Sequence, residues 1–293
     1  MSELPRPLGG GGGAGLGAWL RAPIEALGAR VAAGGARLRD AVIYVGGLVL
    51  LYFKAVKRLG LAPLGGQHRI RASSLVSQCV RVGVRSIPIV IVVQTFVGVI
   101  LALALARPLD EYGARERIAD VVAMAMLREM GALFSAVILS GFAGASIAAE
   151  LGTMVEGEEI KAMRAHALDP IRFLVVPRIV ATAVMMLGLT VLANIVGVMG
   201  GYATSVVFLG ISSSTYIDLT RAAVTLTDFY TGLIKAVVFG TLIAGLACYE
   251  GLNVRGGAEG VGRATTTTVV KCIVALIATD CVFAIIFFQL RIW

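Results

Sequence analysis

The 293-residue sequence has little charge and few aromatic side chains. Only 15% of its residues are Asp, Glu, Lys or Arg, whereas 58% are hydrophobic and the mean hydropathy is +0.88. Soluble domains usually contain about 25% charged residues, so this chain has too little polar surface to cover a water-soluble globule. This excludes an ordinary cytosolic enzyme, a disordered chain and a nucleic-acid-binding module. The 36 glycines favour helices that pack closely in lipid. Composition therefore predicts an all-α polytopic membrane protein.

The sequence also lacks the patterns that bind metals or carry out catalysis. Its four cysteines contain no pair closer than nine residues, and its two histidines lack metal-ligand spacing. The segment Gly257–Ala264 is glycine-rich, but Arg263 and Ala264 stand where a phosphate loop needs Lys and Ser or Thr. We therefore expect no metal, no catalytic residues and a tight cytoplasmic turn at Gly257–Ala264. A chain of this kind is not expected to hydrolyse ATP itself.

Positive charge is concentrated near the N-terminus. Residues 1–85 contain 12 Lys or Arg against 3 Asp or Glu, and residues 86–293 contain 14 against 15. Residues 1–15 form a Gly-rich tail, which we expect to be flexible. Leu16–Arg39 has the spacing of a basic amphipathic helix, and Ala41–Phe53 is apolar but too short to span a bilayer. Together they predict a helix lying on the cytoplasmic face of the membrane, with a helix packed on a partner as the alternative.

Five later stretches are long and apolar enough to be spans. They cover about residues 86–106, 118–150, 179–199, 229–249 and 272–290, and Gly200 and Gly201 are expected to end the third helical stretch. With the N-terminus inside, 19 Lys or Arg fall on the cytoplasmic side and 5 outside. Basic residues concentrate on the cytoplasmic side of membrane proteins, so we expect a cytoplasmic N-terminus and an external C-terminus.

Four charged residues lie inside these predicted spans. They are Arg128, Glu129, Lys235 and Asp280. Their predicted depths differ by under about 8 Å, and their charges sum to zero. A charge within the bilayer is costly unless it is paired or hydrated, so we expect one neutral cluster with a functional role. A structural contact between helices and a proton relay are the alternatives.

The loop between the second and third spans is the other informative feature. It carries a short charged helix on which Ile160, Met163 and Ala167 form a stripe, and Pro170 is expected to end it. A helix of this kind can dock into a partner's groove, the alternative being a solvated connector. Close helix approach is expected at the small residues Gly131, Gly141, Gly144, Ala145 and Ala148.

Several spaced motifs resemble the MlaE/YrbE permeases. They are Leu127–Gly131, Glu150–Met154, Glu158–Ile160, Asp169–Ile171, Pro177–Arg178, Leu233–Phe239, Gly260–Thr265 and Asp280. The resemblance covers roughly residues 68–290. The long N-terminal region resembles the actinobacterial YrbE branch of Mce systems.

The resemblance implies the permease subunit of a lipid ABC transporter in the inner membrane. It implies a second permease chain, identical or paralogous, an ATPase dimer on the cytoplasmic face and MCE proteins on the outer face. ATP and Mg²⁺ would bind in the ATPase, and this chain would hold no cofactor. The ATPase coupling helix would be about Glu156–Ala167, with the residues Glu156, Glu158, Glu159, Ile160, Lys161, Met163 and Arg164.

The chain departs from the family pattern at two places. Gly141-Phe142 replaces a usual Gly-Arg, and Glu158–Met163 differs from the usual coupling-helix sequence. Either change is compatible with altered ATPase docking or with one member of a heterodimeric pair. A proton-driven secondary transporter that uses Glu129 and Asp280, and a non-transporting membrane scaffold, remain the alternative functions.

Overall fold

The computed structural model describes residues 15–60 and 72–291, and these residues form helices without strands. The longer helices are α1 (Gly15–Gly60), α2 (Ala72–Val82), α3 (Ile87–Glu111), α4 (Ile118–Ala125), α5 (Gly131–Leu139), α6 (Ala145–Glu156), α7 (Glu159–Ala165), α8 (Val176–Val207), α9 (Ser213–Ala223), α10 (Leu226–Leu252) and α11 (Gly257–Gln289). Short 3₁₀ turns occur at η3 (Val84–Ser86) and η4 (Arg115–Arg117), and π-helical turns at η5 (Met126–Met130), η6 (Ser140–Gly144) and η7 (Ile171–Val175). The all-α prediction is confirmed.

The chain divides into two units, Met1–Leu50 and Leu51–Trp293, which we describe separately. The described part of the first unit belongs to α1. This single helix joins the predicted amphipathic segment to the apolar stretch that follows it, and Val42 and Val49 are exposed on it. Its position on the membrane surface stays a prediction. The predicted Gly-rich tail lies outside the described residues.

The second unit contains five helical stretches that are long and apolar enough to cross a membrane. They are Ser73–Glu111, Arg115–Glu156, Ile171–Val207, Leu226–Leu252 and Gly257–Gln289. Each predicted span lies on one of them, the fifth ending one residue beyond its helix. The helices are longer than the predicted spans because backbone hydrogen bonding continues past the hydrocarbon-length apolar core. The prediction of five spans is confirmed.

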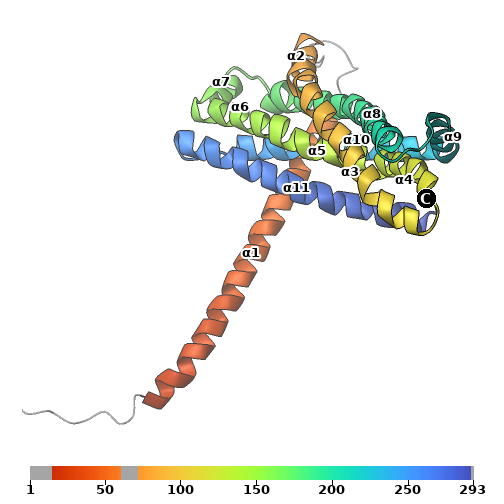
Figure 1. The fold of residues 1–293 in the computed structure, drawn as a ribbon. Coiled ribbons are helices and arrows are strands. Elements are labelled where there is room, and N and C mark those ends of the chain that lie inside the picture. Colours follow the sequence, from red (N-terminus) through yellow and green to blue (C-terminus); the bar gives the residue numbers. More distant parts are fainter. Residues whose placement is uncertain (1–14, 61–71, 292–293) are drawn as a thin grey trace, which may run out of the picture. The chain divides into compact units, whose positions relative to one another are not determined.

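Within the second unit, α7 and α9 lie at opposite ends of the bundle (Figure 1), which we call the α7 end and the α9 end. Helix α8 packs against α3 and α10, and α10 packs against α6 and α11. Helix α9 was not expected from the sequence. It begins where the side chain of Ser212 accepts a hydrogen bond from the backbone N–H of Thr215. The loop-like composition of this region therefore conceals a capped helix.

Two predicted helix ends are wrong. Gly200 and Gly201 lie buried inside α8, and a Cβ at Gly200 would be 2.5 Å from the carbonyl oxygen of Thr95. These glycines allow α3 and α8 to touch, so they do not end a helix. The predicted turn at Gly257–Ala264 is instead the first part of α11. The turn precedes it, and the positive φ angles of Gly256 (98°) and Gly257 (67°) explain the need for glycine there.

Two of the three π-helical turns interrupt the second span, and the other begins the third. η5 and η6 both lie in the stretch Arg115–Glu156, and η7 precedes α8. A π-turn inserts one residue into the α-helical ladder and often occurs at functional positions. Arg128 and Glu129 lie in η5, so the predicted charge cluster begins on irregular helix.

Candidate functional site

Lys235 is the centre of a charged site inside the bundle. Its side chain has no exposed surface, and its ammonium group donates a hydrogen bond of 2.6 Å to Glu129 and forms an ion pair of 2.9 Å with Asp280. The ammonium also lies 5.8 Å from the centre of the Phe287 ring. Three spans therefore meet at one cation. A buried charge requires partners of this kind, because desolvation would otherwise disfavour the charged form.

The two carboxylates of this site are less buried than the cation. The side chains of Glu129 and Asp280 are 24% and 14% exposed. Helix periodicity does not bring these residues together, since each comes from a different span. We call Lys235, Glu129 and Asp280 the Lys235 triad. With all three ionised its net charge is −1, and its partly exposed carboxylates can contact groups outside the chain.

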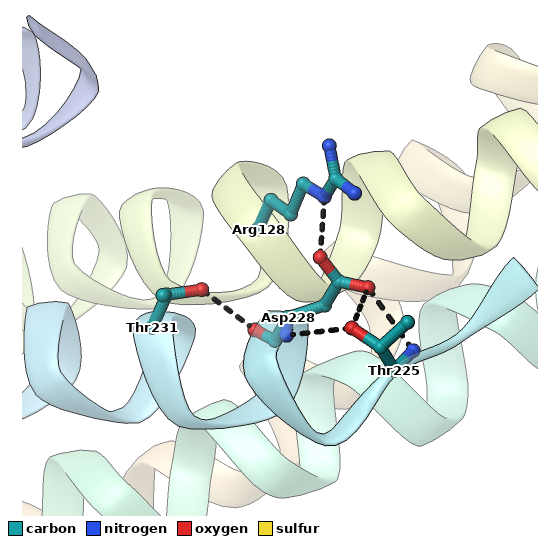
Figure 2. Close-up of polar contacts among 4 residues, drawn as sticks. All are labelled: Arg128, Thr225, Asp228 and Thr231. Atoms are coloured by element: carbon teal, nitrogen blue, oxygen red, sulfur yellow. Dashed lines mark hydrogen bonds and ion pairs between the residues drawn. The ribbon is translucent and has the colours of Figure 1, made fainter. Parts of the chain in front are cut away.

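Arg128 belongs to a second charged site. Figure 2 shows its side chain extending to Asp228, which lies in the first turn of α10, and the two are joined by a contact of 2.6 Å. Asp228 is 2% exposed and Arg128 is 26% exposed. The same carboxylate caps α10, because it accepts hydrogen bonds from the backbone N–H and the hydroxyl of Thr225. Thr231 then donates to the backbone carbonyl of Asp228 (Figure 2). The ion pair therefore depends on how α10 begins.

The four predicted charges thus contribute to two centres. The structure brings Glu129, Lys235 and Asp280 together and joins Arg128 to Asp228. The two partners on α10 are seven residues apart, which corresponds to about 10 Å along a helix. The single neutral cluster expected from the sequence is corrected, because Asp228 lies at the very start of the fourth span and supplies a charge that the cluster omitted. A functional role for these residues stays a prediction.

The predicted small-residue contacts occur at some positions and not at others. A Cβ at Gly131 would overlap the side-chain oxygen of Asn194, and Ala148 is fully buried with its carbonyl oxygen 2.9 Å from where a Cβ at Gly251 would be. Gly144 has ordinary clearance, with its nearest neighbours at 3.5 and 3.7 Å, and Ala145 is half-buried. Gly141 is exposed, and nothing lies within 4 Å of a Cβ there, so the predicted close packing at Gly141 is wrong within this chain.

Closer approaches occur at glycines that the sequence did not single out. A Cβ at Gly98 would overlap the carbonyl oxygen of Gly197, and one at Gly232 would overlap that of Leu127. The first contact joins α3 to α8, and the second joins α10 to η5. Backbone contact at Gly232 therefore places η5 next to α10, where both charged sites form.

The predicted coupling helix is shorter in the structure. Glu156 is the last residue of α6, and α7 runs from Glu159 to Ala165. Glu158 precedes α7 with a φ of 57° and pairs with Lys161 at 2.6 Å, which lowers the pKa of the Glu158 carboxyl group. Pro170 does not end this helix, because it lies at the start of the next one.

One face of α7 is anchored and the rest is exposed. Ile160 is buried and Met163 is half-buried, whereas Lys161 and Arg164 are exposed, as is Glu159. Ala167 is exposed and follows the helix with a φ of 58°, so it does not belong to the predicted apolar stripe. A short helix that joins two spans and presents acidic and basic side chains to its surroundings can bind a partner of mixed charge.

A family model and individual relatives both match this chain, and the family and most of these relatives are described as permeases. The family described as Permease MlaE matches residues 75–286. A probable ABC transporter permease protein of Rickettsia typhi is 35% identical over 236 residues, which cover 80% of this chain and 89% of the relative. The intermembrane phospholipid transport system permease protein MlaE of Haemophilus influenzae is 30% identical over 250 residues, covering 83% of this chain and 96% of the relative. The chloroplastic protein TRIGALACTOSYLDIACYLGLYCEROL 1 of Arabidopsis thaliana is 32% identical over 75% of this chain and 63% of the relative.

Proposed function

Because the chain belongs to the MlaE permease family, we propose that it is the membrane subunit of an ABC transporter that moves phospholipid or another hydrophobic substrate. A separate ATPase dimer binds ATP and Mg²⁺ and docks on α7, and MCE proteins bind at the α9 end. Two permease chains, identical or paralogous, enclose a cavity open to lipid. The N-terminus is cytoplasmic, the C-terminus is outside, and the transporter lies in the inner membrane.

The observation that carries this proposal is the form of α7. It connects the second and third spans, is held by Ile160, and leaves its charged side chains exposed. A solvated connector would not require a buried anchor or a helix. A helix anchored on one face and charged on the other is suited to transmit a push from a docked partner.

The two charged sites support a role inside the membrane for the same chain. Glu129 and Arg128 are each partly exposed, whereas their partners Lys235 and Asp228 are almost fully buried. Exposed halves of buried ion pairs can face a second permease chain or a hydrated cavity. We propose that these sites change partners when the cavity changes shape, so that neither carries a proton across the membrane as a relay.

The test is reconstitution with the ATPase, partner permease and MCE protein of the same transport system. The complete complex in proteoliposomes should transfer fluorescent phospholipid only when ATP is hydrolysed. Lys161→Glu with Arg164→Glu should prevent the ATPase from co-purifying, because it reverses the basic charge of α7. Arg221→Glu on α9 is the matched control at the opposite end and should leave the ATPase bound to the permease.

Three results would contradict the proposal. If no complex with the ATPase forms, the chain is not its permease. If transfer continues with hydrolysis blocked but stops when the proton gradient is removed, the chain is a secondary transporter. If neutralising Lys235 and Asp280 together leaves lipid transfer unchanged, the charged sites have no transport role and a scaffold with structural ion pairs is favoured.

A further inference from the structure

A cluster of charged residues joins α6 and α8, the helices that precede and follow the α7 loop. Glu150, on α6, forms an ion pair of 2.5 Å with Arg81 of α2 and a second of 3.0 Å with Arg178 of α8. Both contacts use the same carboxylate oxygen. Arg178 is 4% exposed and also donates a hydrogen bond of 2.7 Å to the carbonyl of Leu174 in η7. One carboxylate thus connects three helices.

A second ion pair holds the other side of the same loop. Asp169, four residues after α7, pairs with Arg58 in the last turn of α1 at 2.6 Å. The other oxygen of Asp169 accepts a hydrogen bond from the backbone N–H of Ile171, where η7 begins. Tyr52 fixes this part of α1 to α10, because its hydroxyl donates to the carbonyl of Thr241 at 2.6 Å. The loop that carries α7 is therefore fixed on both sides.

These contacts differ in kind from the other ion pair at this loop. Glu158 and Lys161 are both more than two-thirds exposed and lie three residues apart, so their contact stays within the loop. Glu150 and Arg178 are 28 residues apart, and their contact joins the two spans that α7 connects. An ion pair that is partly buried and connects two rigid helices limits their relative motion, whereas an exposed local pair does not.

We propose that Glu150 is a positioning residue for transport: by pairing with Arg81 and Arg178 it makes α2, α6 and α8 move together when α7 is displaced. Without it, a push on α7 is absorbed by bending of the loop. With it, the push moves the second and third spans. This inference rests on the proposed function, because it takes α7 as the site where the ATPase docks.

The test measures how much lipid the complex transfers for each ATP that it hydrolyses. Glu150→Gln keeps the shape of the side chain and removes its charge. In the reconstituted complex it should reduce lipid transfer per ATP by about tenfold and leave ATP hydrolysis within about twofold of the wild type. Glu250→Gln is the matched control, since Glu250 forms a partly buried ion pair of 2.7 Å with Lys271, which joins α10 to α11. Its transfer per ATP should equal that of the wild type.

A purely structural role would give a different result. If Glu150 only stabilises the fold, Glu150→Gln will lower the yield of complex, ATP hydrolysis and transfer in the same proportion, which would overturn the inference. An unchanged transfer per ATP would overturn it too. If Glu150→Gln does not assemble, Arg81→Gln decides, because Arg81 is 45% exposed and its loss leaves Arg178 paired. That variant should show a smaller fall in transfer per ATP, and no fall would overturn the inference.

The proposed function can fail separately from this inference. A wild-type complex that shows no ATP-dependent transfer contradicts the proposed function and the inference together. A wild-type complex that transfers lipid, with Glu150→Gln equal to it, contradicts the inference alone.

Discussion

Lys235 and Glu129 are joined by a hydrogen bond of 2.6 Å, although they lie 106 residues apart and on different spans. The ammonium is fully buried, and its second carboxylate, that of Asp280, comes from a third span. The triad is therefore a tertiary contact as well as a charged site. Removing one member removes an ionic contact of another and affects the packing of α10 against its neighbours.

The first prediction concerns Lys235→Met. This change keeps the length of the side chain but leaves two carboxylates close together without their cation. We expect a loss of about 3–5 kcal/mol in the free energy of unfolding, as for other buried pairs that lose one partner. Denaturant unfolding in detergent measures it. The triple variant with Glu129→Gln and Asp280→Asn is the control and should recover most of the stability. Equal stability of the single and triple variants would show that the charges do not interact.

The second prediction compares the two members of the Arg128 pair. Asp228→Ala should destabilise the protein by about 1 kcal/mol more than Arg128→Gln, because only Asp228 also caps α10. The same unfolding measurement applies to both variants. Thr225→Ala, which removes the hydroxyl contacts of the cap but keeps the ion pair and the backbone hydrogen bond to Asp228, should account for part of the difference. If Arg128→Gln proves the more costly change, the cap contributes little.

The third prediction concerns close contact between helices. Gly98→Ala should cost about 1–3 kcal/mol, because the new methyl group would overlap the backbone of α8. Gly141→Ala is the matched control. Its methyl group meets no atom within 4 Å, so it should be neutral or stabilise the helix by up to about 1 kcal/mol. Thermal unfolding of the two variants in the same detergent gives the comparison. A marked loss of transport by Gly141→Ala, with stability kept, would place a partner chain against that face.

The fourth prediction uses Tyr216 on α9. Burial raises the pKa of its phenol to about 12, and its hydroxyl has no hydrogen-bond partner among the described residues. Tyr216→Phe should therefore not lower the free energy of unfolding, and removal of the unpaired hydroxyl should raise it by about 1 kcal/mol.

The same residue makes stability depend on alkaline pH. The pKa of Tyr216 in the folded protein is above its ordinary value of 10.0. Its contribution to the free energy of unfolding is therefore complete below pH 10 and is lost as the pH rises toward about 12. Comparing unfolding of the wild type and Tyr216→Phe at several alkaline pH values tests this. A pH dependence that Tyr216→Phe does not reduce would assign it to other groups.

The spans could be predicted from the sequence because hydropathy is a local property. An apolar window long enough to cross a bilayer predicts a span whatever the rest of the chain does. All five windows fall on helices of the structure. The ends could not be placed, since α11 begins at Gly257 with residues that are not apolar enough to extend the window. Its start depends on two glycines with positive φ, which a hydropathy average does not detect.

The charged sites could be predicted only in part. Equal depth in the bilayer brought Glu129, Lys235 and Asp280 together correctly, because helices of similar tilt place equal residue counts at equal depth. The partner of Arg128 was missed because Asp228 lies one residue before the predicted fourth span. The signal was present in Thr225-x-x-Asp228, the pattern of a capping box, which marks the first turn of a helix.

The Glu150 contacts could not be predicted. Arg81, Glu150 and Arg178 lie on three elements. Glu150 and Arg178 each belong to a motif of the family resemblance, but neither those motifs nor helical periodicity indicates that the two residues contact each other or Arg81. The surplus of basic residues near the N-terminus indicated topology, and it also supplies Arg58 and Arg81 as partners of the α7 loop. Composition gives the sign of a region's charge, whereas partners are determined by how the helices pack.

The π-turn η5 gives the second span a constraint on its length. Each residue of an α-helix rotates the chain by about 100° about the helix axis. The extra residue in η5 therefore determines which way the side chains before it face relative to those after it. Deleting a single residue there would leave every charged and small side chain present, yet it would rotate Arg128 and the residues before it away from α10. This span therefore tolerates exchange of one apolar residue for another more readily than any change in its number of residues.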